Sequence, residues 1–434
     1  MIAKIKNLLE NSDADGYKII ETKTDAEESF LVKKAVDLTR SKEVHHFNVT
    51  VYMDFQDNQT KYKGSSTFNV HPSMKDADIK KLIDDGIFAA GFVKNEYYEI
   101  PKAENEKIEN LKSKFSTGKL SDWMPKLVDA LYINDNEKKG GINSAEIFLN
   151  KNYKRILTSS GVDSSYESYD GMIEFITTWK ESEETEEIEL YKMLTFSDYD
   201  PKFISSAVSE MIFLAKERAN AKDTVPSGKY RVILSGDSVK EVLSYYVIKS
   251  WASSVYNKIS TVKVGDLIQG EEVKGDLINL VLDPKIENSV HSAPIDNDGL
   301  ILSKVSVIEQ GKLKSYHGDL RHSYYLGTKP TGSIGNFVVS AGSKTISDMK
   351  KATYVELVTF SDFQMNPVTG EFGGEIRLGW YFDGETTKKI TGGSLSGNIE
   401  DIHHNIYLSK ELQSNGDFVG PKAIEMFDLT VAGK

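Results

Sequence analysis

Two stretches of alternating apolar and polar residues, GMIEFITTWK at residues 171–180 and EIELYKMLTF at residues 187–196, indicate how the first half of this chain folds. Each places an apolar side chain at about every second position, as a half-buried β-strand does, and an acidic turn joins them. The same alternation marks residues 47–55, and residues 61–70 follow as a partner strand. We therefore expect an antiparallel sheet built from hairpins.

Helical patterns accompany these strands. After Ser73, apolar residues recur on one helical face up to Ile87. Pro201 opens another helix, whose apolar stripe extends to Ala215, and proline is tolerated in the first turn of a helix. The N-terminal part is therefore predicted to be mixed α/β with an antiparallel sheet, and the fold class of the chain is predicted to be α+β.

Glycine divides the chain into two parts. Residues 1–225 contain nine of the 32 glycines, and residues 226–434 contain the other 23. Because glycine marks tight turns, the second part is predicted to be β-rich. We expect an N-terminal α+β domain at residues 1–222 and a C-terminal β-rich domain at residues 223–434. The strands expected in the second domain are residues 230–234, 277–282, 305–309 and 375–382.

One helix is expected early in the second domain, at residues 238–250. Ser238 and Glu241 have the spacing of a capping box, and apolar residues follow at helical intervals. Ser244 and Tyr245 fall outside the apolar stripe, so they are predicted to be able to face a cavity without disturbing the core.

Composition excludes several classes of protein. The net charge of −12, without any run of five basic residues, speaks against nucleic-acid binding. No run of 18 apolar residues is present, so no membrane-spanning segment is expected. The chain has no cysteine, which excludes disulfides and thiolate ligands, and we expect a cytoplasmic location.

Self-sufficient catalytic motifs are missing. The chain contains no His-Glu-x-x-His, no Gly-x-Ser-x-Gly and no phosphate-binding glycine loop. The best metal-like cluster places Glu400, Asp401, His403 and His404 within five residues. We interpret this cluster as a polar helical turn after residues 397–398; a metal site there is the alternative hypothesis.

Six segments, taken in order, resemble the TldD/PmbA family, the so-called modulators of DNA gyrase. The most specific are NPVTGEF and GGSLSGN, and the resemblance is strongest from residue 228 onward. The segments are residues 145–161, 228–235 with the helix that follows to residue 250, 296–299 together with 307–313, 366–372, 392–398 and 427–433.

Within that family, the TldD type carries His-Glu-x-x-x-His on the helix that corresponds to residues 238–250, and a later cysteine completes a zinc site. The matching positions here are Ser244, Tyr245 and Lys249. Zinc needs imidazole, carboxylate or thiolate ligands, and an ammonium has no free lone pair. The chain therefore resembles the TldE (PmbA) type, and we predict no catalytic residue and no metal ligand in it.

The resemblance implies a role as the non-catalytic subunit of a TldD/TldE-type zinc metalloprotease complex. In such a heterodimer, zinc lies in the TldD-type partner, and unfolded or short peptides enter an internal passage for maturation or degradation. Homodimers are expected when the chain is isolated. Two alternatives stay open: a self-sufficient metal-dependent peptidase, and a gyrase-modulating regulatory protein. The expected passage or partner contacts are Asn366, Pro367, Thr369, Gly370, Phe372 and Asn398.

Overall fold

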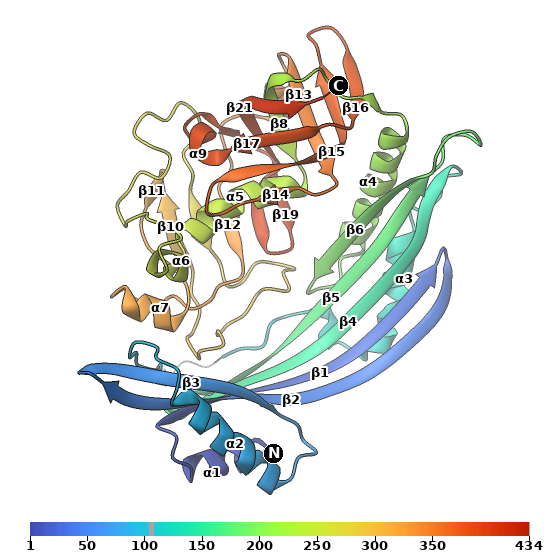
Figure 1. The fold of residues 1–434 in the computed structure, drawn as a ribbon. Helices are drawn as coiled ribbons and strands as arrows, with labels where there is room; N and C mark the ends of the chain where they lie inside the picture. The colour runs from blue at the N-terminus through green and yellow to red at the C-terminus, as the bar shows by residue number, and fades with distance from the viewer. Residues whose placement is uncertain (104–107, 434) are drawn as a thin grey trace.

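The computed structural model describes residues 1–103 and 108–433. Its N-terminal part is one antiparallel sheet of six long, curved strands, with the order β3-β2-β1-β4-β5-β6 (Figure 1). The expected α+β class is confirmed. The strands of this sheet are β1 (Gly16–Val32), β2 (Ala35–Asp57), β3 (Thr60–Val70), β4 (Gly140–Thr158), β5 (Asp163–Trp179) and β6 (Ile188–Phe196).

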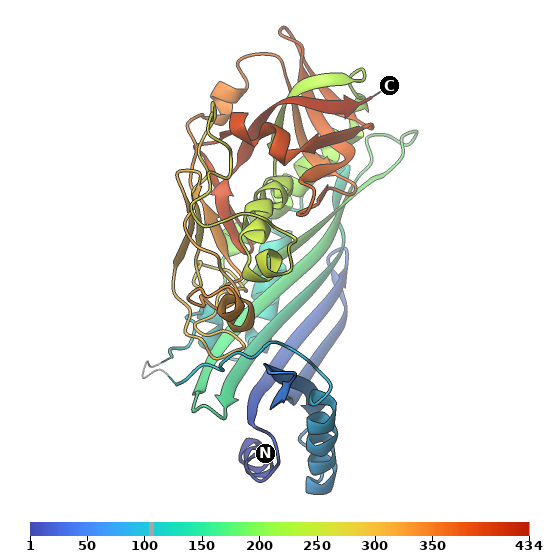
Figure 2. The same cartoon turned by 60° about the vertical axis from the view of Figure 1, so that its left-hand side comes forward.

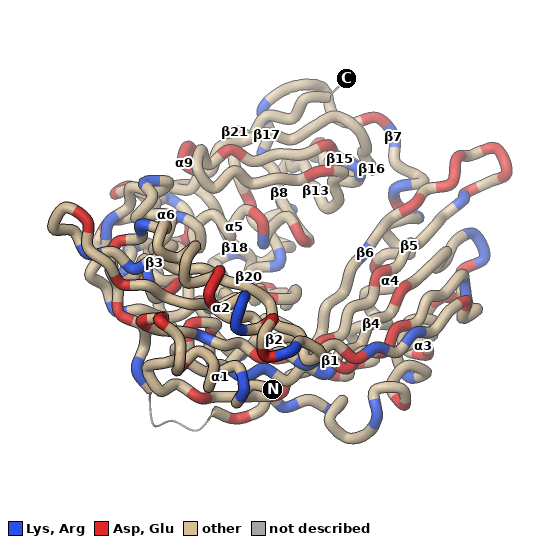
Figure 3. Tube along the Cα trace, turned by 60° about the horizontal axis from the view of Figure 1, so that its bottom comes forward, with Lys and Arg blue, Asp and Glu red and all other residues tan. Residues whose placement is uncertain are grey.

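Both predicted hairpins are present. β5 pairs with β6 from Gly171 opposite Phe196, and β2 pairs with β3 from Phe47 opposite Val70. The strands extend beyond the predicted segments, because β1 and β4 pair along nearly their whole length and support one another. The turn between β5 and β6 carries a group of exposed carboxylates, which Figure 3 shows as a red hairpin end. Such charge on an edge hairpin discourages pairing with other sheets.

Four helices cover one face of this sheet. Ile19 and Leu31 of β1 lie an even number of residues apart, so their side chains point to the same face. Ile19 packs in the core below α1 (Ile2–Glu10) and α2 (Asp76–Ala90), and Leu31 packs in the core below α3 (Met124–Tyr132) and α4 (Pro201–Ala219). Figure 2 shows α1 and α2 at the end of the strands far from the C-terminus.

The predicted helix at Pro201 is confirmed as α4. The side chain of Asp200 caps it, because Oδ1 accepts hydrogen bonds from the backbone N–H groups of Lys202 at 2.9 Å and Phe203 at 3.0 Å. Ile204 and Val208 of its apolar stripe are fully buried. In the described ranges, no helix is both long enough and apolar enough to span a bilayer.

The C-terminal part consists of two further sheets. One has nine strands, ordered β13-β8-β21-β17-β15-β16-β7 with β14 and β18 added beside β15 and β21, and the other has the order β11-β10-β9-β12-β20-β19. The strands of the first are β7 (Lys222–Asp223), β8 (Gly228–Ser235), β13 (Tyr354–Phe360), β14 (Gln364–Met365), β15 (Glu371–Phe382), β16 (Thr387–Thr391), β17 (Ser394–Asn398), β18 (Tyr407–Leu408) and β21 (Ala423–Ala432). Those of the second are β9 (Leu280–Leu282), β10 (Val305–Glu309), β11 (Lys312–Leu313), β12 (Phe337–Val339), β19 (Leu412–Asn415) and β20 (Phe418–Pro421).

Helix α5 (Asp237–Lys249) contacts strands of both sheets, and its apolar residues belong to their shared core. The expected capping role of Ser238 is wrong. The helix begins at Asp237, after Gly236 at φ 75°, and Ser238 is buried inside the first turn. The remaining helices are short: α6 (Ala252–Tyr256), α7 (Leu320–Tyr325), α8 (Ile346–Met349) and α9 (Ile399–Ile402).

Loops of the C-terminal part dock on the sheet face opposite the helices. Lys18 of β1 forms an ion pair of 2.7 Å with Asp298, and Ile156 of β4 packs against Ile295. The predicted boundary at residue 223 falls within β7, which pairs in parallel with β16. Chain segments before and after that boundary are therefore joined by ion pairs, apolar contacts and strand pairing.

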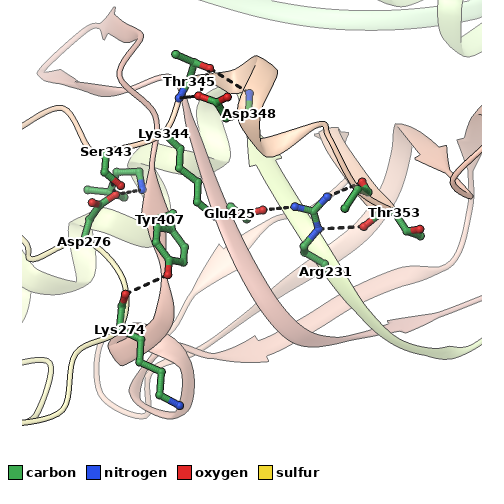
Figure 4. A network of polar contacts seen from close by, with 12 residues as sticks. Arg231, Lys274, Asp276, Ser343, Lys344, Thr345, Asp348, Thr353, Tyr407 and Glu425 are labelled. Carbon is green, nitrogen blue, oxygen red and sulfur yellow. Dashed lines mark hydrogen bonds and ion pairs between the residues drawn. The ribbon is translucent and has the colours of Figure 1, made fainter.

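A buried carboxylate ties three segments of the C-terminal part together (Figure 4). Glu425 of β21 is completely buried and forms ion pairs with Arg231 of β8 and with Lys344, whose Nζ lies 2.5 Å from Oε2. Arg231 also donates to the carbonyl of Thr353 at 2.9 Å. Burial without these two cations would cost several kcal/mol, since an unpaired charge is poorly solvated in a protein core.

We expect Glu425→Gln to destabilise the chain by about 3–5 kcal/mol, because it leaves Arg231 and Lys344 without their buried counter-charge. Thermal unfolding followed by calorimetry measures the change. Glu385→Gln, at an exposed turn of the same part of the chain, is the matched control and should have little effect. Equal unfolding temperatures for the two variants would contradict this account of the network.

Candidate functional site

The three positions that the family resemblance aligned with the zinc motif, Ser244, Tyr245 and Lys249, lie in the second half of α5. We call α5 the zinc-motif helix because of this expected correspondence. The Ser244 hydroxyl donates to the backbone carbonyl of Glu241 at 2.7 Å, so it is engaged with its own helix. Tyr245 is only 5 % exposed and packs in the core, which contradicts the expectation that it lies outside the apolar stripe. The physical reason is that α5 is covered by both sheets, so its apolar contact surface is wider than a single stripe.

Tyr245 and Lys249 are one helical turn apart and converge on Glu400 of α9. The Tyr245 hydroxyl donates to Oε1 at 2.5 Å, and the Lys249 ammonium lies 3.0 Å from the same oxygen. The ammonium also donates to the backbone carbonyl of Val368 at 3.3 Å and lies 5.1 Å from the centre of the Tyr245 ring. A fixed organic cation therefore occupies this end of the helix.

The electrostatics of this cluster favour an ionised Glu400. The hydrogen bond from Tyr245, followed by that from Lys249, lowers the pKa of Glu400. Burial and then the bond to Glu400 raise the pKa of Tyr245, so the phenol stays a hydrogen-bond donor. Oε1 of Glu400 already accepts hydrogen bonds from the Tyr245 hydroxyl and the Lys249 ammonium. Because the other two groups are donors, they do not form a set of ligands that converge on a metal ion.

The turn at residues 366–370 is clamped to the start of α9. Asn366 Oδ1 accepts hydrogen bonds from the N–H groups of Val368 at 2.9 Å and Thr369 at 3.2 Å. Gly370 has φ 77°, and a Cβ there would lie 2.7 Å from Asn398 Oδ1, so only glycine fits. Asn398 donates to the carbonyl of Thr369 at 2.9 Å and accepts from the N–H of Glu400.

An open groove lies beside this turn, and we call it the β17 groove. Asn366, Phe372 and Asn398 line it, so three of the six predicted contact residues face one surface. The groove encloses about 730 Å³ and adjoins a second hollow of about 340 Å³. The other three predicted residues, Pro367, Thr369 and Gly370, form the turn that supports it. Residues shared by the two hollows are Ser396, Gly397, Asn398, Asp401 and Thr430.

The alternative metal cluster does not assemble. Glu400 faces Lys249, whereas the ring of His403 lies against that of Tyr246, with centroids 6.5 Å apart. Burial lowers the pKa of His403. Asp401 and His404 line the smaller hollow. Within residues 1–103 and 108–433, no three His, Asp or Glu side chains come close enough to share a metal ion. The interpretation of this segment as a polar helical turn is confirmed by α9, with Asn398 as its cap.

Comparison with known proteins then identifies the family. Residues 227–433 match the PmbA/TldA metallopeptidase C-terminal domain. These residues, just under half of the chain, place its C-terminal part in the TldD/PmbA family. They include α5, the 366–370 turn and the β17 groove.

Curated relatives match parts of the chain. Uncharacterized protein MJ0231 of Methanocaldococcus jannaschii is 24% identical over 223 residues, which are 49% of this chain and 52% of that protein. The Metalloprotease TldD homolog of Buchnera aphidicola is 26% identical over 178 residues, 38% of this chain and 36% of the relative. The matches thus span about half or less of the length of these two relatives.

Two crystal structures share the fold of the whole chain. TldE from Thermococcus kodakarensis has a TM-score of 0.79 at 14% identity, and the match covers 99% of this chain and 100% of that one. A proposed modulator of a DNA gyrase from Thermotoga maritima has the same TM-score and coverage at 17% identity. At such identity the likeness establishes the fold and nothing more.

Sequence reasoning missed two partners of the zinc-motif helix. The first is the Val368 carbonyl, and the second is His317, which is 5 % exposed. His317 Nε2 donates to the Val247 carbonyl at 2.8 Å, and its own carbonyl accepts from the N–H of Ala252 at 2.7 Å. His317 therefore holds the C-terminal end of α5. Tyr245 and Lys249 are four residues apart, and this spacing indicates that both side chains lie on one face of the helix and can contact the same group. No pattern in the sequence indicated the role of His317.

We expect Lys249→Met to lower the free energy of unfolding by about 1 kcal/mol, because Glu400 is half exposed and the ion pair is partly screened. The larger effect should be faster hydrogen exchange at residues 366–370, which lose the ammonium contact. Lys351→Met is the control, since Lys351 forms an exposed pair with Asp348. Equal exchange at residues 366–370 in the two variants would show that Lys249 does not hold the turn.

His317 predicts a pH dependence of stability. Burial lowers its pKa from 6.5 to about 4. The unfolded chain therefore takes up this proton at a higher pH than the folded one, and stability falls as the pH drops from about 6.5 toward 4, by about 3 kcal/mol in all. Urea unfolding at several pH values should show a shallower dependence for His317→Gln than for the wild type. The exposed His71→Gln is the control, and a His317→Gln profile parallel to the wild type would contradict the assignment.

Proposed function

We propose that this chain is the TldE-type, non-catalytic subunit of a TldD/TldE-type zinc metallopeptidase complex that matures peptides or degrades unfolded ones. The observation that carries the proposal is the Lys249 ammonium, ion-paired with Glu400 at the end of the zinc-motif helix. A cation fixed by a carboxylate and a backbone carbonyl repels a metal ion and supplies no lone pair. The expected zinc, and the water that it activates, belong to the partner chain.

Two surfaces support a role in handling peptides. The β17 groove is open, and the backbone and polar side chains of its walls can hydrogen-bond an extended peptide. The face of the N-terminal sheet opposite the helices carries polar groups beside its apolar contacts. On this face Asn152 accepts from Thr24 at 2.8 Å, and Asn150 donates to Asp170 at 2.7 Å. Such polar groups suit a wet passage better than a dry interface.

Assembly is the direct test of this proposal. The chain alone should bind no stoichiometric zinc and cleave no unfolded peptide, whereas a mixture with a TldD-type chain that carries His-Glu-x-x-x-His should cleave it. Elemental analysis, gel filtration and a fluorogenic peptide assay provide the measurements. Peptide cleavage by the metal-free lone chain would overturn the proposal. Recovery of the lone chain as a homodimer would agree with the expected self-association.

The groove provides a sharper variant. Ser396 is exposed and lines both hollows, so Ser396→Trp should fill the groove and lower kcat/KM of the assembled complex at least about tenfold without loss of folding. Thr387→Trp, on the exposed strand β16, is the matched control. If the two variants assemble and cleave peptides equally, the groove takes no part in the reaction.

The gyrase hypothesis has weaker support. The similarity to a proposed gyrase modulator is a likeness of fold, and the net charge of −12 opposes direct contact with DNA. Affinity capture with the tagged chain separates the two ideas, because it should recover a TldD-type chain and not gyrase. We place the complex in the cytoplasm, as the cysteine-free composition predicts.

A further inference from the structure

Another hollow, separate from the β17 groove and its neighbour, lies where α7 covers the N-terminal sheet. It encloses about 270 Å³ between α7, the loop at Asp298 and the sheet face opposite α1 and α2. Lys18, Thr50 and Thr67 sit in one row across β1, β2 and β3, and all three line it. Strands and a helix thus build its walls from both parts of the chain.

Arg321 of α7 places its guanidinium at this hollow. No carboxylate among the described residues forms an ion pair with it. Its Nη1 donates to Asn95 Oδ1 at 3.1 Å. The side chain is half-buried. A partly buried guanidinium usually pairs with a carboxylate, and it presents several N–H donors in a planar fork.

The two acids that line the hollow are already satisfied by other groups. Asp298 forms its ion pair with Lys18 at 2.7 Å. Asp319 accepts from both the backbone N–H and the Nδ1 of His322, at 2.9 Å and 2.8 Å. Within the described residues neither acid forms an ion pair with Arg321, so N–H donors of the guanidinium stay available to the hollow.

Buried hydroxyls add neutral donors beside the guanidinium. Tyr52 and Tyr98 are only 5 % and 8 % exposed, and both line the hollow. The side chain of Tyr98 hydrogen-bonds that of Tyr52. Among the described residues, no carboxylate or backbone carbonyl accepts from the Tyr52 hydroxyl, so its proton is left for another acceptor. Burial, and then the charge of Asp298 or of the neighbouring tyrosine, raises the pKa values of both phenols, so both stay protonated. A buried hydroxyl whose proton has no acceptor normally finds one.

We infer that this hollow binds a compact oxyanion, held by the Arg321 guanidinium and the Tyr52 hydroxyl. A planar carboxylate or a phosphate matches the donor fork of arginine, and the volume admits a group of that size. Two sources share this chemistry: the C-terminal carboxylate of a peptide, and free inorganic phosphate. The peptide source rests on the proposed function, whereas the oxyanion site itself does not.

Isothermal titration on the full chain without a partner tests the inference. The probes are N-acetyl trialanine with a free carboxylate, the same peptide as its C-terminal amide, and inorganic phosphate. Arg321→Met should weaken binding of the favoured anion at least about tenfold, and Tyr52→Phe should weaken it several-fold. Arg321→Lys keeps the positive charge but loses the planar fork of donors, so its affinity for the anion should lie between that of the wild type and that of Arg321→Met. Arg377→Met, at a partly exposed arginine that pairs with Glu375, is the matched control and should bind as the wild type does.

Each outcome decides the proposal. Binding of the free peptide, but not of its amide, supports the site with a peptide terminus as source. Phosphate binding that depends on Arg321 supports the site with a free anion as source. If no probe binds, or if Arg321→Met and Arg377→Met bind equally, the inference is overturned. Because no partner and no cleavage are involved, failure here is separate from failure of the proposed complex.

Discussion

The ion pair between Lys249 and Glu400 is the contact on which the interpretation of this protein depends. It joins the zinc-motif helix to α9 and, through the Val368 carbonyl, to the 366–370 turn. An ammonium can hold these oxygens together without a metal, because it donates hydrogen bonds where a metal ion would accept lone pairs. One cation thus joins α5, α9 and the 366–370 turn.

The surroundings of this pair are built to keep α5 in place. Both C-terminal sheets cover the helix, His317 holds its last turn, and the buried Glu425 network fastens the strands behind it. Such rigidity is what a surface needs when it must present a groove to a peptide or to a partner chain. The turn that borders the groove depends on one left-handed glycine and two asparagines.

The long N-terminal sheet has a different task. One face packs apolar side chains against four helices, and the other receives loops of the C-terminal part through both apolar contacts and an ion pair. Antiparallel sheets tolerate this division, since alternate side chains point to opposite faces. The oxyanion hollow lies where that second face meets α7, so it belongs to the junction of the two parts and to neither alone.

Local patterns in the sequence were enough to predict the β2–β3 and β5–β6 hairpins, the helix α4 and the helical turn after Asn398, because period, turn residues and caps act over a few neighbours. The family resemblance predicted passage or partner contacts at residues 366–372 and at Asn398; that role stays a prediction, and the structure places these residues around one turn and one groove. What the tertiary structure decided was which distant groups meet: Lys249 with Glu400, His317 with Val247, and Arg321 with Asn95. These contacts join residues from far apart along the chain, and only the packing of sheets and helices sets their distances.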